Sequence, residues 1–352
     1  MIGGEAVVKT LYALGCRVVF GIPGTHNLAI YEGLRKTPDI RHILCRNEQG
    51  AGYMANGFGR VRGLPGVAIV TTGPAAANIL ASVGDAYRDR VPLLIIASQI
   101  PRNYIGMDRG IFHEMVDQAG MFSSAGAAVF RAQVAVDIPL AVRSAYKATI
   151  EGCPRPAYVE IPQDVLYEDF PDNGWKTERL GKGPRIVSFN NEYSGKLEET
   201  RAFLAKAKRP LILAGAGASR SEVRKGTAAV RRLAETFKVP VFTTVHGKGV
   251  IPEDHSLSAG VLLPWLRETR DLCKRADFLL ALGTGFNQRS TDNWNLSLPK
   301  EIIQVDINDT AIGKNYPVRF GIKGDIHEVT EQLLGGDRAE LGEMEVGAPE
   351  RQ

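Results

Sequence analysis

Continuous apolar runs that alternate with helical stretches constrain this chain more than any other feature of its sequence. Three of these runs lie in the first third of the chain, at residues 19–22, 67–70 and 93–97. Strands that are apolar on both faces are typical of parallel sheets covered by helices on each side. The sequence therefore predicts an α/β fold with two doubly wound parallel-sheet domains.

The chain divides into two such alternating segments. A predicted strand over residues 156–162 is closed by a proline, and a polar stretch follows it. The predicted boundaries are a first domain at 1–166, a linker at 167–185, a second domain at 186–335 and a flexible tail at 336–352. The tail is charged or small in composition and has no apolar periodicity, which is typical of a frayed end.

The composition excludes several classes of protein. The 352 residues are 44% hydrophobic and 23% charged, and the net charge of +4 is spread along the chain, which disfavours nucleic-acid binding. We find neither an uncharged apolar stretch of about 18 residues nor a signal peptide, and we expect a cytoplasmic protein. The cysteines are far apart and form no metal or disulfide pattern: Cys16, Cys45, Cys153 and Cys273.

One carboxylate stands where a predicted strand turns into a helix. Glu48 follows the apolar residues 43–45 and precedes a helix rich in small residues. The predicted packed face of this helix is Ala51, Met54, Ala55 and Phe58. The N–H groups of a first helical turn favour a negative charge, and small neighbours let a flat ring approach. Glu48 could therefore exchange a proton with a ligand nitrogen, or it could only complement the helix dipole.

Two further turns follow predicted strands. Pro23 and Gly24 come after the first strand, and Gly73 and Pro74 come after a later one, with Asn78 in the helix that follows. Ligands of parallel sheets bind at the carboxyl ends of the strands. We therefore expect both turns and Glu48 to face one crevice.

Four short motifs occur in order along the first domain. They are Phe20-Gly21-Ile22-Pro23-Gly24, Arg46-Asn47-Glu48-Gln49-Gly50-Ala51, Gly73-Pro74 with Asn78, and Phe112-His113-Glu114. In this order they resemble the motifs of thiamine-diphosphate enzymes related to acetolactate synthase and 2-oxo acid decarboxylases. Later segments resemble the central, Rossmann-like domain of that family, among them Lys208-Arg209-Pro210, Gly247-Lys248-Gly249 and Val305-Asp306-Ile307. The resemblance covers residues 1–335.

The resemblance implies a catalytic role for Glu48. In the family, a glutamate in this position bonds the ring nitrogen of the cofactor's aminopyrimidine. Proton exchange there leads to loss of the thiazolium proton, and the resulting carbon nucleophile attacks a 2-oxo acid and accepts electrons as carbon dioxide leaves. By the same resemblance, Pro23 and Gly24 line the pocket, while Gly73, Pro74 and Asn78 approach the pyrimidine.

Three departures from the family pattern fall in the first domain. Asn47 replaces the usual histidine, and Ala75 and Ala77 replace a glycine and a threonine, which is expected to narrow the pocket and remove a hydroxyl. His113 stands where the synthases have glutamine, as in relatives that decarboxylate larger 2-oxo acids. Near a cofactor it could act as an acid or base and touch the substrate, or it could be a polar loop residue.

His26 follows the Pro23-Gly24 turn and is a second candidate for contact with the substrate. The alternative for His26 is a helix N-terminal residue whose ring is satisfied by solvent. The other histidines lack a paired carboxylate or a ligand spacing, and the sequence predicts no metal site.

The sequence of the central domain leaves open whether it binds a flavin. Gly215-Ala216-Gly217 follows a strand, but Arg220 occupies the place of the third small residue of a dinucleotide motif, which favours a tight turn. Some relatives bind FAD here. Gly283-Thr284-Gly285 and Arg289 fall where flavin contacts are expected, whereas Gly260-Val261-Leu262 departs from the family pattern and weighs against FAD.

The resemblance also implies a partner. Relatives hold the diphosphate through Mg²⁺ in a third domain, which we expect to come from another chain or a longer product because no such oxygen cluster occurs here. The active site then lies between subunits of a homo-oligomer or between this chain and a separate subunit. One hypothesis is a thiamine-diphosphate lyase or transferase acting on a 2-oxo acid. The other is a non-catalytic homologue that serves as an interaction or nucleotide-binding module.

Overall fold

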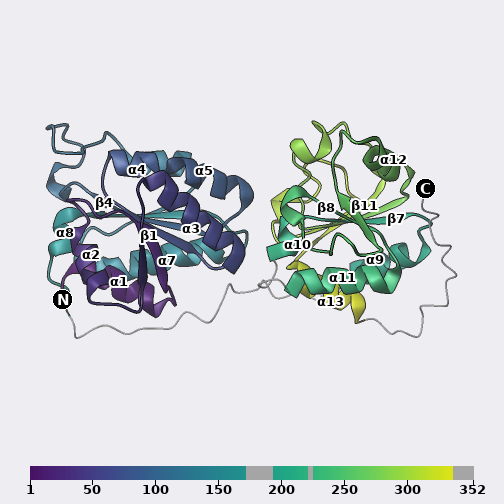
Figure 1. Cartoon of the computed structure of the whole chain (residues 1–352), viewed down its shortest axis with the longest axis horizontal. Helices are drawn as coiled ribbons and strands as arrows, with labels where there is room; N and C mark the ends of the chain where they lie inside the picture. Colours follow the sequence, from purple (N-terminus) through teal and green to yellow (C-terminus); the bar gives the residue numbers. More distant parts are fainter. Residues whose placement is uncertain (172–192, 221–224, 336–352) are drawn as a thin grey trace. The chain divides into compact units, whose positions relative to one another are not determined.

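The computed structural model describes residues 1–171, 193–220 and 225–335. The chain forms two compact units, Met1–Arg185 and Ile186–Gln352, which are treated separately below (Figure 1). Of the predicted linker, residues 172–185 lie outside the described part, as does the predicted tail at 336–352. The described beginning of the linker is bound to the first unit, because Asp169 bridges Ile2 and Phe170 N–H donates to the Met1 carbonyl.

The first unit is a six-stranded parallel sheet with the order β2-β1-β3-β4-β6-β5. Its strands are β1 (Val18–Gly21), β2 (Arg41–Leu44), β3 (Gly66–Val70), β4 (Leu93–Gln99), β5 (Ala128–Arg131) and β6 (Pro156–Pro162). Its helices are α1 (Gly3–Ala13), α2 (Leu28–Arg35), α3 (Glu48–Arg62), α4 (Pro74–Asn78), α5 (Leu80–Asp89), α6 (Gln118–Ser124), α7 (Ile138–Ile150) and α8 (Gln163–Tyr167), with short 3-10 turns η1 (Arg102–Tyr104) and η2 (Ala135–Asp137). The predicted fold class is confirmed for this unit.

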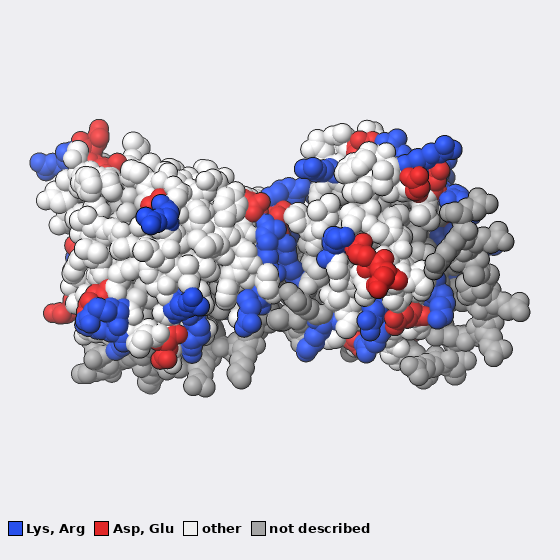
Figure 2. All heavy atoms as spheres, in the orientation of Figure 1, with Lys and Arg blue, Asp and Glu red and all other residues white. Residues whose placement is uncertain are grey.

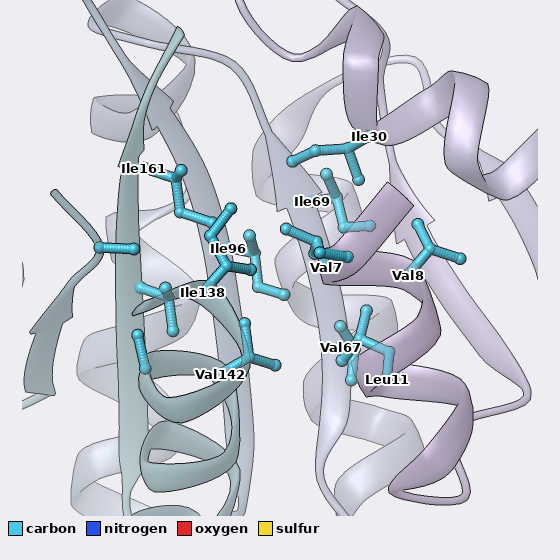
Figure 3. Packing of buried hydrophobic residues seen from close by; sticks show 14 of the residues in the cluster. Val7, Val8, Leu11, Ile30, Val67, Ile69, Ile96, Ile138, Val142 and Ile161 are labelled. Carbon is cyan, nitrogen blue, oxygen red and sulfur yellow. The ribbon is translucent and has the colours of Figure 1, made fainter. Parts of the chain in front are cut away.

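Two apolar layers sandwich this sheet, as the continuous apolar strands predict. Successive side chains of a strand point to opposite faces, so alternate residues of β3 and β4 enter different layers. On one face, α1 and α7 pack on Val67, Ile69 and Ile96, as Figure 3 shows. On the other face, Ala68 and Ile95 pack in a layer with residues of α3, α5 and α6.

The burial of residues in the edge strand β2 and in α3 differs from the predicted burial. β2 pairs only with β1, and Leu44 at its end is 66% exposed. In α3, Ala51 and Ala55 are buried as predicted, but Met54 is 41% exposed, so its assignment to the packed face was wrong. Glycines explain the difference, because Gly52 and Gly59 complete the buried face of the helix in place of larger side chains.

The second unit has a parallel six-stranded sheet of its own, with the order β12-β11-β10-β7-β8-β9. Its strands are β7 (Pro210–Ala214), β8 (Val241–Thr243), β9 (Ser258–Val261), β10 (Phe278–Leu282), β11 (Glu301–Asp306) and β12 (Phe320–Lys323). Its helices are α9 (Ser194–Lys206), α10 (Ala216–Arg220), α11 (Lys225–Phe237), α12 (Arg267–Arg275) and α13 (Ile326–Leu334), with 3-10 turns η6 (Val245–Gly247), η7 (Arg289–Thr291) and η8 (Asp309–Ala311). The predicted fold class is confirmed here as well.

Charged side chains of both signs lie on the surface of the described residues (Figure 2). Figure 2 shows basic and acidic side chains intermingled on one face, with a wide uncharged area on the first unit. No helix of the described part is both long and apolar enough to cross a lipid bilayer.

Two glycines of α3 give a matched test of its packing. A Cβ at Gly59 would lie 2.5 Å from the Pro92 carbonyl oxygen, whereas a Cβ at Gly57 would meet no atom within 4 Å. We expect Gly59→Ala to lower the free energy of unfolding by about 1–3 kcal/mol, because backbone must move. Gly57→Ala should raise it by about 0.5–1 kcal/mol through helix propensity. Denaturant unfolding of both variants checks this, and equal effects would contradict the close packing of α3.

Candidate functional site

Three strand ends of the first unit bring the predicted turns to one edge of the sheet. β1 lies between β2 and β3, with Gly21 paired to Leu44 on one side and to Ile69 on the other. The chain passes from β1 outward to β2 and then returns to the opposite side of β1 to form β3. This reversal is the switch point at which ligands of doubly wound sheets bind.

Glu48 is the first residue of α3. Asn47 caps the helix, its Oδ1 accepting a hydrogen bond from Gln49 N–H at 2.8 Å. The unpaired N–H groups of this first turn favour an ionised carboxylate. The prediction that Glu48 lies in the first helical turn is confirmed.

The structure joins Glu48 to Asn78, the last residue of α4. Asn78 Nδ2 donates to Glu48 Oε2 at 2.9 Å. In the described part of the chain, Glu48 Oε1 accepts no hydrogen bond. The side chain is half-buried, and a Cβ added at the neighbouring Gly50 would meet open space. One carboxylate oxygen is thus fixed and the other is available to a ligand nitrogen, which fits the aminopyrimidine.

The Gly73-Pro74 turn positions Asn78. Gly73 has φ +65° and ψ −114°, a backbone conformation that residues with a Cβ rarely adopt, and a Cβ here would lie 2.4 Å from the His113 carbonyl oxygen. Pro74 then begins α4 at a position where its missing N–H costs nothing. The short helix ends at Asn78, and the helical Ile79 leads on into α5, so the turn and α5 together place the Asn78 amide.

The two replaced positions of the turn differ in burial. Ala75 is 6% exposed and belongs to the apolar layer with Phe20 and Val83, so its methyl group fills core space beneath the turn. Ala77 is half-buried.

The Pro23-Gly24 turn is held by a buried residue that sequence analysis missed. Asn27 is fully buried, its Oδ1 accepting from Gly24 N–H at 2.7 Å and its Nδ2 donating to the Ile22 carbonyl at 3.2 Å. A Cβ at Gly24 would lie 2.8 Å from Thr71, so the turns after β1 and β3 are in contact. An asparagine just before α2 was the available signal, since this residue type closes turns through its side chain.

The structure brings His26 and His113 together, although the sequence suggested them separately. Their ring centroids are 5.7 Å apart, and Phe112 stacks on His113 at 3.8 Å and lies 5.9 Å from His26. His26 is 4% exposed, and Nδ1 of each histidine is buried and has no hydrogen-bond partner among the described residues. Burial, and then the neighbouring His113, lower the pKa of His26, which favours the neutral ring. His26 is therefore not satisfied by solvent.

Neither His26 nor His113 forms a hydrogen bond with Glu48 within the described residues. His113 also has φ +68°, an uncommon backbone conformation for a residue with a side chain. Glu114 closes its own loop, since its Oε2 accepts from Ile111 N–H at 3.0 Å. Among the residues that the structure covers, no group of three His, Cys, Asp or Glu side chains could hold a metal ion.

The glycine turns of the second unit pack backbone to backbone. A Cβ at Gly215 would lie 2.3 Å from the Gly283 carbonyl oxygen, and one at Gly217 would lie 2.7 Å from Gly283 Cα. Gly217 N–H donates to the Gly283 carbonyl at 3.0 Å. Close contact between the turns after β7 and β10 accounts for these glycines without a ligand.

Comparison with known proteins identifies the family. Residues 1–121 match the N-terminal TPP binding domain of thiamine pyrophosphate enzymes, and residues 197–333 match the central domain of the same enzymes. Thiamine pyrophosphate is the cofactor called thiamine diphosphate above. The chain belongs to the thiamine-diphosphate enzyme family, as its motifs predicted.

Three curated relatives show which members of the family the chain resembles. The chain is 37% identical over 333 residues to a probable 2-ketoarginine decarboxylase of Pseudomonas aeruginosa, covering 94% of this chain and 57% of the relative. It is 33% identical over 341 residues to a probable acetolactate synthase large subunit of Methanocaldococcus jannaschii, covering 95% and 56%. It is 34% identical over 349 residues to the acetolactate synthase large subunit of Corynebacterium glutamicum, covering 98% and 54%. The chain thus spans just over half the length of these relatives.

The buried His26 predicts a pH dependence of stability. Its pKa is lowered in the folded state, so the unfolded chain binds the proton more readily. The stabilising contribution is complete above the unfolded pKa of about 6.5 and is lost as the pH falls from there towards the folded pKa. We expect His26→Phe to lose part of the drop in unfolding free energy between pH 7.5 and 5.5. Denaturant unfolding at both pH values measures it, with His246→Phe in the second unit as control; an undiminished drop in His26→Phe would contradict it.

Proposed function

We propose that this chain supplies the activating glutamate of a thiamine-diphosphate enzyme that acts on 2-oxo acids, by decarboxylation or by acetolactate synthase-like carboligation. The observation that carries the proposal is the Glu48–Asn78 pair, with one carboxylate oxygen bonded and the other available. A glutamate that only complements a helix dipole has no need of a second side chain to orient it. Membership of the family supports the same cofactor.

Different residues at this edge of the sheet bind the cofactor and activate it in the proposed site. Glu48 Oε1 would hold the ring nitrogen of the aminopyrimidine and exchange a proton with it, while Asn78 bonds Oε2 and limits rotation of the carboxylate. Pro23, Gly24, Gly73 and Pro74 would line the pocket for the ring. When bound, the cofactor supplies the carbon nucleophile and the electron sink for decarboxylation.

His113 and His26 are assigned to the substrate side. Each has a buried Nδ1 with no hydrogen-bond partner among the described residues, and such a nitrogen can accept or donate a single hydrogen bond to a 2-oxo acid. His113, the less buried of the two, is the proposed acid or base, and His26 is proposed to contact substrate. A buried group without a partner costs free energy in the unliganded protein, which a substrate contact would offset.

The remaining parts of the site lie outside these residues. We assign the diphosphate and its Mg²⁺ to a further domain, supplied by a longer product or by a separate subunit in a cytoplasmic oligomer. Exposed apolar side chains on α3 suit a subunit interface: Tyr53, Met54 and Val61. The first unit, predicted at 1–166, is the pyrimidine-binding domain, and 186–335 is the central domain. Backbone packing of the second unit's glycines supports a tight turn there rather than a flavin site.

Replacement of Glu48 tests the proposal. In an enzyme completed with a diphosphate domain, thiamine diphosphate and Mg²⁺, Glu48→Gln should slow hydrogen–deuterium exchange at the thiazolium carbon by at least about 100-fold, because the amide cannot exchange the proton. Exchange is measured by NMR after acid quench. Glu5→Gln is the matched control, since Glu5 also lies in a first helical turn, that of α1. Wild-type exchange rates in Glu48→Gln would refute the proposed role of Glu48. Exchange in the wild-type assembly no faster than in free cofactor would instead favour a non-catalytic module.

A further inference from the structure

A buried polar network lies beneath the Gly73-Pro74 turn. It joins α6, β4 and β6 through Gln118, Ser98, Tyr158 and Glu160, none of which is more than 4% exposed. Polar groups are costly to bury unless they are hydrogen-bonded, and an apolar core would hold the same elements together. The position of this network therefore calls for a reason beyond packing.

Gln118, the first residue of α6, is the centre of the network. Its Oε1 accepts from Gly73 N–H at 2.6 Å. Its Nε2 faces three acceptors, the Ser98 carbonyl at 3.0 Å, Tyr158 Oη at 2.7 Å and Glu160 Oε2 at 3.3 Å. Because Gly73 N–H can only donate and a carboxylate can only accept, the orientation of this amide is determined on both sides.

The partners of Gln118 are themselves held in place. The Tyr158 ring stacks on Phe122 at 3.7 Å, and its hydroxyl donates to Glu160 Oε2 at 3.0 Å. Burial, followed by the Glu160 charge, raises the pKa of Tyr158 well above its usual range, which keeps this donor protonated. Gln99 Nε2 and Arg131 Nε each lie 3.3 Å from a Glu160 oxygen.

We propose that Gln118 is a positioning residue for the activating carboxylate, acting through the Gly73 N–H, the direction of α4 and the Asn78 amide on Glu48. This inference rests on the proposed function of Glu48. Each step is a contact within the first unit: Gln118 holds Gly73, Gly73 and Pro74 start α4, and Asn78 at the end of α4 bonds Glu48 at 2.9 Å. Through these contacts the buried network around Gln118 would orient the half-buried carboxylate of Glu48.

The same residue also ties the histidine loop to the turn. Gln118 ends the segment between β4 and α6 that carries His113, and the His113 carbonyl lies against Gly73. Asp117 caps α6, its Oδ1 accepting from Gly120 N–H at 2.8 Å, so the start of the helix is fixed. Gln118 is thus proposed to position both Asn78, on the pyrimidine side, and His113, on the substrate side, relative to the Gly73-Pro74 turn.

NMR of the full chain tests the geometry without requiring cofactor or activity. Gln118→Met keeps the side-chain length and removes every hydrogen bond. We expect the Gly73 amide to exchange with deuterium at least about tenfold faster, and the Asn78 side-chain amide signals, assigned with Asn78→Asp, to move towards those of a free asparagine. Thr149→Val is the matched control, because it removes a buried hydroxyl bonded to the Tyr146 carbonyl in α7. It should leave both readouts at their wild-type values.

The outcomes separate the two proposals. Unchanged Gly73 exchange and Asn78 signals in Gln118→Met would overturn the positioning role, whatever the melting temperature does. If Gln118→Met does not fold, Tyr158→Phe keeps the stacked ring and removes one acceptor of Gln118, and it should move both readouts in the same direction. Failure of the proposed function would appear elsewhere, as unaltered thiazolium exchange in Glu48→Gln, and would leave these NMR results intact.

Discussion

The hydrogen bond from Gly73 N–H to Gln118 Oε1 joins an outer turn of the first unit to its buried polar core. On one side of this bond, Gly73 has a positive φ, which glycine adopts readily. Helix α4 starts from this turn, and Asn78 at its end bonds Glu48. On the other side, Tyr158 and Glu160 hold the amide in a single orientation. In the proposed arrangement this connection fixes the start of α4, and α4 continues through Ile79 into α5.

Electrostatics divide this edge into two environments. Glu48 begins a helix, where the N–H groups favour a negative charge, and it stays half-buried. His26 is buried in a stack of rings, where desolvation lowers its pKa and favours the neutral form. The edge therefore offers a carboxylate at a helix start and a buried imidazole, that of His26, whose lowered pKa favours the uncharged form.

The two units differ in strand order and in how their glycines are packed. Both are parallel six-stranded sheets, and both have glycines where strands end. In the first unit, Gly73 gives the turn its direction and Gly50 borders open space. In the second unit, the backbone of Gly283 fills the space beside Gly215 and Gly217. Gly73 is packed against the His113 carbonyl in a similar way, so close backbone packing accounts for glycines in both units.

The sequence by itself determined the α/β class and the position of Glu48 at a helix start, because these follow from local apolar runs and turn residues. It pointed to the Pro23-Gly24 and Gly73-Pro74 turns for the same reason. The tertiary structure decided what could not be read locally: that Asn78 bonds Glu48 and that His26 stacks with His113. It also decided that Met54 is exposed while Gln118 reaches Gly73, 45 positions away. Such contacts join residues distant in sequence, and only the order of strands in the sheet brings them within hydrogen-bonding distance.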